Sequence, residues 1–100
     1  MGPERFRDIP EYPDYEISEY GMVRNRRTHV ILMWRPSTVS GKACVELIDP
    51  ENRNRRMMVS IRHIQKSAWP EASDSAVRYV ENWRSVHESG QDEPESTERA

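Results

Sequence analysis

The chain has 100 residues and a mass of 11.8 kDa, which suits one small domain and excludes a two-domain enzyme. Hydrophobic residues make up 35%, no apolar run approaches the roughly 18 residues of a membrane span, and the N-terminus is too polar for a signal peptide, so we expect a cytoplasmic protein without membrane contact. The formal net charge is −2, and one cysteine and three histidines exclude an internal disulfide and predict neither a metal site nor a cofactor.

Short strands are predicted for the first 60 residues. Prolines in residues 1–13 predict an extended entry rather than a helix. Alternating apolar positions then predict short strands, and Gly21 and residues 49–54 predict turns between them. The third strand has two largely apolar faces, so we expect it to lie centrally. The five predicted strands span residues 15–18, 22–26, 30–35, 42–48 and 55–60.

Two helices are predicted after Ser60, where the apolar spacing changes. Residues 61–69 carry one apolar face and end before Pro70, and Ser73 begins a second amphipathic helix over residues 75–88. Residues 91–100 are acidic and poor in apolar side chains, which predicts a disordered tail. The fold class is therefore α+β, a small antiparallel β-meander of about five short strands followed by two helices.

The charges are sorted along the chain. Residues 21–66 hold ten Lys and Arg side chains against three acids, whereas both flanking segments are net acidic. A basic middle segment favours nucleic-acid binding, and the alternative is solubilising charge partnered by the six N-terminal acids. The candidate DNA-binding residues are Arg24, Asn25, Arg26, Arg27, Arg35, Lys42, Arg53, Asn54, Arg55, Arg56, Arg62 and Lys66.

Two Arg-Asn elements stand out among these candidates. Arg24-Asn25-Arg26-Arg27 and Arg53-Asn54-Arg55-Arg56 are predicted to occupy adjacent strand ends. Arginine can bond phosphate or guanine through two parallel hydrogen bonds, and asparagine suits the edge of adenine. A two-stranded ribbon fits the major groove, so these elements predict contacts with phosphates and base edges.

The segment from Phe6 to Trp69 resembles a known family. An aromatic residue is followed by Ile, two tyrosines three residues apart, Ile-Ser, Gly and Val-Arg, and residues 61–69 form a short helix ending in Trp. This order is similar to the nuclease-associated modular domain at the N-terminus of HNH homing endonucleases, which bacteriophages frequently encode. The resemblance implies DNA binding and, for a phage protein, the cytoplasm of a bacterial host. Phe6 departs from the family, where Trp is usual, and so does Arg62-His63, where His-Arg is usual.

In full-length relatives this helix leads into the HNH nuclease core. Residues 70–89 offer only Asn82 and His87 toward such a core, so no catalytic residue is predicted. We therefore expect a modular domain over residues 1–69, an amphipathic helix packed on it over 70–90, and the tail over 91–100.

The expected function is a double-stranded DNA-binding module without its own nuclease centre. One alternative is a small, metal-dependent HNH-type endonuclease, a hydrolase acting on phosphodiester bonds. The other is a phage protein-interaction factor, and a homodimer or protein partner would then contact the 75–88 helix.

Overall fold

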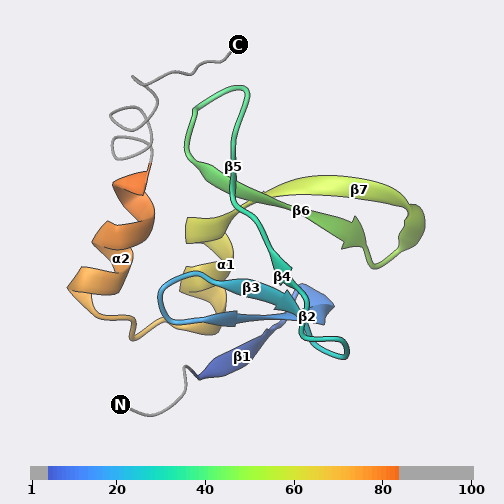
Figure 1. The fold of residues 1–100 in the computed structure, drawn as a ribbon, viewed down its shortest axis with the longest axis horizontal. Coiled ribbons are helices and arrows are strands. Elements are labelled where there is room, and N and C mark those ends of the chain that lie inside the picture. Colours follow the sequence, from blue (N-terminus) through green and yellow to red (C-terminus); the bar gives the residue numbers. More distant parts are fainter. Residues whose placement is uncertain (1–4, 84–100) are drawn as a thin grey trace.

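The computed structural model describes residues 5–83, which form an α+β domain with two helices, as predicted, and with seven strands where about five were expected. All strand pairs are antiparallel, and the strands divide into two sheets (Figure 1). The elements are β1 (Phe6–Ile9), β2 (Tyr12–Ser18), β3 (Val23–Asn25), β4 (Ile31–Leu32), β5 (Arg35–Pro36), β6 (Ala43–Asp49), β7 (Asn52–Ser60), α1 (Ile61–Ala68) and α2 (Asp74–Glu81).

The first sheet has the order β1-β2-β3-β4. The N-terminal segment, predicted as an extended entry, forms its edge strand β1. The turn between β2 and β3 depends on Gly21, whose φ of +93° disfavours any side chain. The Ser18 hydroxyl accepts a hydrogen bond from the Met22 backbone N–H and closes this turn.

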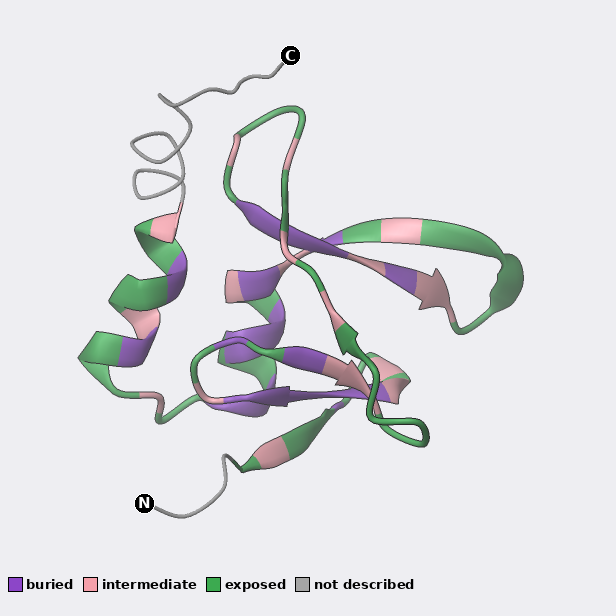
Figure 2. Cartoon of the chain, viewed as in Figure 1, coloured by how far each residue is buried: buried purple, intermediate pink, exposed green. Residues whose placement is uncertain are grey.

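The second sheet has the order β5-β6-β7, and the β6–β7 hairpin is its main part. Ala43, Val45 and Leu47 alternate along β6 and are buried, and Val59 lies opposite Val45 on β7. Most of β7 from its first residue to Arg56 is exposed, as its green colour in Figure 2 shows. The hairpin therefore buries its base in the core and leaves its tip on the surface.

The prediction of a central strand over residues 30–35 was wrong. The segment divides into β4, which pairs with β3, and β5, which pairs with β6, so that the chain crosses from one sheet to the other (Figure 1). A strand with two apolar faces needs a covering layer on both, and here Met33 remains 81% exposed. Trp34 is half-buried, and its indole N–H donates to the Gly21 carbonyl at 2.9 Å.

Helix α1 joins the two sheets. It begins at the cap residue Ser60, whose hydroxyl accepts from the His63 backbone N–H, and it contacts β1 and β2 as well as β6 and β7. Ile61 and Ile64 are completely buried. The indole N–H of Trp69, directly after the helix, donates to the Ile17 carbonyl of β2 at 2.9 Å.

Helix α2 packs on α1 and confirms the predicted second helix as far as Glu81. Ser73 caps it, Ala76 and Val80 are buried, and the buried Gln65 amide donates to the Ala76 carbonyl at 3.2 Å. The predicted continuation over 84–88 and the predicted tail over 91–100 lie outside the described residues. No helix within residues 5–83 is long and apolar enough to cross a membrane.

Substitution of Gly21 tests this packing. A Cβ there would lie 2.8 Å from Trp34 Cζ2 and 2.9 Å from Ile61 Cγ2, in addition to the strain of a positive φ. We expect Gly21→Ala to lower the free energy of unfolding by about 2–4 kcal/mol in urea titrations. Gly41→Ala is the control, because Gly41 also has a positive φ of +73° but lies between the exposed Ser40 and Lys42. Equal losses in the two variants would contradict the packing described for Gly21.

Candidate nucleic-acid interface

The two Arg-Asn elements lie side by side because both contact Asp14 on β2. The Arg26 backbone N–H donates to the Asp14 carbonyl at 2.9 Å, and the Arg53 guanidinium donates to the Asp14 carboxylate at 2.7 Å. Near the same place, the Ile48 N–H of β6 donates to the Tyr15 hydroxyl at 3.2 Å. The tip of the β6–β7 hairpin is thereby held against the end of the first sheet.

The second element forms a bulge in β7. Ile48 pairs with Arg56 and Asp49 pairs with Asn52, so residues 53–55 have no counterpart on β6. Bulges of this kind bend a strand and redirect its side chains. Here the bulge directs Arg53 toward Asp14 and leaves the next three side chains of β7 exposed.

The first element is bound to the protein itself. Arg24 is stacked on the Phe6 ring at 3.7 Å and paired through Nε with the nearly buried Glu16. Asn25 Oδ1 accepts from the backbone N–H groups of Arg27 and Thr28, both at 2.9 Å. These contacts make Arg24 and Asn25 structural residues.

Six predicted site residues have exposed side chains without a hydrogen bond or ion pair to any residue from 5 to 83. Two of these, Lys42 and Lys66, lie apart from the rest. The other four lie at the end of the first sheet or at the hairpin tip and are Arg27, Asn54, Arg55 and Arg56. Two further arginines in this region form ion pairs with acids, Arg26 with Asp8 at 3.5 Å and Arg53 with Asp14. The Asp14 carboxylate raises the pKa of Arg53 above its ordinary value, so Arg53 stays charged.

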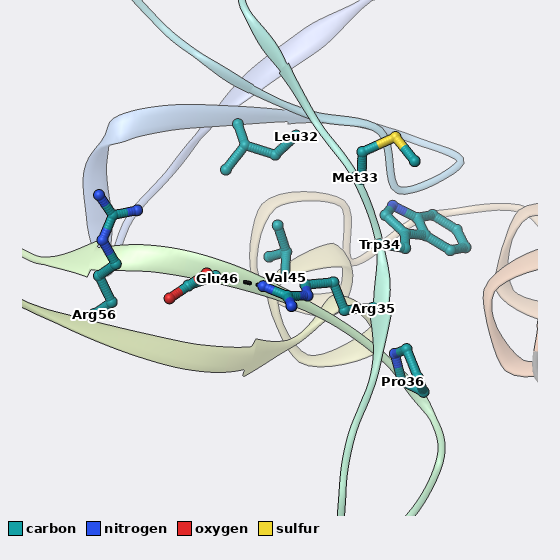
Figure 3. Close-up of a pocket in the computed structure, with 8 residues that line it drawn as sticks. All are labelled: Leu32, Met33, Trp34, Arg35, Pro36, Val45, Glu46 and Arg56. Carbon is teal, nitrogen blue, oxygen red and sulfur yellow. Dashed lines mark hydrogen bonds and ion pairs between the residues drawn. The ribbon is translucent and has the colours of Figure 1, made fainter.

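Arg56 also borders a cavity of about 600 Å³ between the β4–β5 segment and the hairpin (Figure 3). In this cavity the Glu46 carboxylate is paired with Arg35 at 3.1 Å, and the Arg56 guanidinium points away from it. Glu46 therefore pairs with Arg35 and not with Arg56, so the Arg56 guanidinium can bind an external anion.

The remaining predicted residues do not join this group. Lys42 is exposed at the start of β6, Lys66 is exposed on α1, and Arg62 pairs with Glu81 of α2 at 3.5 Å. The alternative explanation, that N-terminal acids partner the basic segment, holds for Arg24, Arg26 and Arg53. It does not account for Arg27, Arg55 and Arg56, which are exposed and have no acidic partner among residues 5–83.

Sequence reasoning missed Asp14 as the residue that joins the two elements. Nothing in the sequence near Asp14 distinguishes it from the five other N-terminal acids, because its role depends on a hairpin that lies 39 positions away.

His63 is exposed with Nε2 3.0 Å from Glu11, and residues 5–83 contain no group of three or more potential metal ligands among His, Cys, Asp and Glu. Cys44 is buried, and this burial raises the pKa of its thiol.

A second, apolar groove of about 890 Å³ lies between α2 and the β3–β4 region. Trp34 makes edge-to-face contacts there with Tyr79 and Trp83, and Met33 and Tyr79 are largely exposed. The predicted partner or dimer contact through residues 75–88 stays a prediction.

Comparison with known proteins gives one family. The model of the NUMOD4 motif, which is associated with homing endonucleases, matches residues 4–69, about two thirds of the chain. This range agrees with the resemblance found over residues 6–69. No match to this chain was found among the curated proteins or among the solved structures.

The free energy of unfolding tests the distinction between arginines paired within the protein and arginines that are exposed and unpaired. Arg24→Ala would leave Glu16, whose side chain is only 11% exposed, without its partner. We expect a loss of about 1–3 kcal/mol in the free energy of unfolding. Arg27→Ala removes an exposed, unpaired guanidinium and should stay within about 0.5 kcal/mol of the parent chain. Urea titration of both variants checks this order, and a larger loss for Arg27→Ala would contradict it.

Proposed function

Because the chain belongs to the NUMOD4 motif family, we propose that residues 5–83 act as a double-stranded DNA-binding module. The observation that carries this proposal is the group of arginines that Asp14 gathers at the end of the first sheet. Its members are Arg26, Arg27, Arg53, Arg55 and Arg56. We call it the arginine cluster. Guanidinium groups match the geometry of phosphate oxygens, and a positively charged surface attracts the duplex.

The net charge of −2 does not oppose this function. Two of the acids beside the arginine cluster are already engaged, Asp14 by Arg53 and Asp8 by Arg26. Exposed ion pairs of this kind contribute only about 0–1 kcal/mol, so a phosphate can replace the carboxylate at little cost. All five guanidiniums of the cluster are therefore available to DNA.

The hairpin supplies the geometry for duplex binding. A two-stranded antiparallel ribbon such as β6–β7 is narrow enough for the major groove, and its exposed tip carries three members of the arginine cluster. Contacts with phosphates would position the module, and contacts with base edges would give sequence preference.

The salt dependence of binding tests the proposal. Five phosphate contacts predict that log K falls with log salt concentration with a slope of about −4 to −5, at roughly −0.9 per contact. Arg55→Gln/Arg56→Gln should make that slope shallower by about 2, measured by fluorescence anisotropy on a 20-bp duplex. The matched control is Lys66→Gln/Arg78→Gln, which removes two exposed helix cations outside the cluster. We expect the control to keep the slope of the parent chain.

Absence of salt-dependent duplex binding by the parent chain would refute the proposal. Equal slopes for the two double variants would exclude the arginine cluster as the binding surface. The same protein also tests the endonuclease alternative, by incubation with supercoiled plasmid in Mg²⁺ or Mn²⁺. We expect binding without nicking, and metal-dependent nicking abolished by His63→Ala would favour the endonuclease.

A further inference from the structure

The two Arg-Asn elements look alike in sequence but differ in what their asparagines can bond. The Asn25 carboxamide oxygen accepts two backbone N–H groups, from Arg27 and Thr28, and the residue is half-buried. A base edge would have to compete with both hydrogen bonds, whose loss would open the turn after β3. Asn25 is therefore unavailable for base reading.

Asn54 has the opposite surroundings. It is exposed at the centre of the β7 bulge, and its carboxamide bonds to nothing within residues 5–83. The bulge around it is braced, since the Asn54 backbone N–H donates to Asn52 Oδ1 at 3.1 Å and the Ile48 N–H on the facing strand donates to the Tyr15 hydroxyl at 3.2 Å. A braced backbone with a free carboxamide presents a donor and an acceptor at low entropic cost.

The neighbours of Asn54 supply the anchoring that base reading needs. Arg55 and Arg56 follow it directly, are exposed, and have no acidic partner in the described part of the chain. Guanidiniums on flanking phosphates would fix the register of the bulge against the duplex. The carboxamide then has the donor–acceptor pattern that pairs with N7 and N6 of adenine in the major groove.

We propose that Asn54 is the specificity-determining residue of this module and reads an adenine in the major groove, while Arg55 and Arg56 bind the flanking phosphates. This proposal rests on the DNA-binding function proposed above. It assigns base reading to the second Arg-Asn element and a structural role to the first.

Selection from a pool of randomised duplexes tests this assignment. The parent chain should enrich a motif with adenine at one position, and Asn54→Ala should lose about tenfold or more of the discrimination at that position. Its affinity for non-preferred duplexes should stay within about threefold, because the phosphate contacts remain. Asn25→Asp is the control, since aspartate keeps the acceptor of the turn but has no donor for a base. Its added charge should weaken all duplexes alike and leave the preferred motif unchanged.

The outcomes separate the two proposals. A parent chain that binds no duplex overturns both DNA binding and base reading. A parent chain that binds without base preference, or an Asn54→Ala variant that keeps the same preference, overturns the role of Asn54 and leaves DNA binding in place. A changed motif for Asn25→Asp would assign reading to the first element and likewise overturn the inference. Circular dichroism of both variants should match the parent chain, which confirms that each comparison is made on folded protein.

Discussion

The hydrogen bond from the Trp69 indole to the Ile17 carbonyl fixes the C-terminal end of α1 to the first sheet. The two sheets share no strand, and α1, which Trp69 follows directly, packs on both. The Arg7 guanidinium lies 3.8 Å from the centre of the Trp69 ring and donates to the Ala68 carbonyl, so β1 is joined to the same point. Because α1 also packs on β6 and β7, this contact relates β2 to the hairpin. The far end of β2 carries Asp14.

Asp14 gives the molecule its electrostatic asymmetry. Its carboxylate and carbonyl bind one arginine from each basic segment, and Tyr15 beside it accepts a hydrogen bond from the hairpin. The carboxylates of Glu11 and Asp49 also lie near this end, where they add to burial in raising the pKa of Tyr12. Asp8 and Asp14 therefore hold Arg26 and Arg53, and the unpaired guanidiniums of Arg27, Arg55 and Arg56 are exposed. A chain with a negative net charge can present a basic surface in this way, because the charge of a surface depends on which side chains lie on it and not on the total for the chain.

Two sequence elements of nearly the same composition acquire different roles through their surroundings. One begins within the short strand β3, in the middle of a sheet, where its first arginine is stacked on Phe6 and its asparagine closes a turn. The other lies in a bulge at the tip of a hairpin, where Asn52 Oδ1 accepts from the Asn54 backbone N–H and the side chains of residues 54–56 are exposed. Some residues of the two elements therefore stabilise the fold, and others are free to contact a ligand. A base preference requires ligand-contacting residues on a backbone that the structural residues keep in place.

Much of this protein is determined locally and could be predicted from its sequence. The alternation in β6, the apolar spacing of α1 and the serine cap at Ser73 are short-range signals, and they correctly predicted an α+β fold. The family resemblance depended on local residue order in the same way and agrees with the matched range. The crossing of residues 30–35 between two sheets was not predictable, because both apolar faces of that segment favour burial and only the final packing shows that one is left uncovered. The division of the arginines was also decided by tertiary structure, since the partner of Arg53 lies 39 positions earlier and reaches it only when the hairpin folds back onto β2.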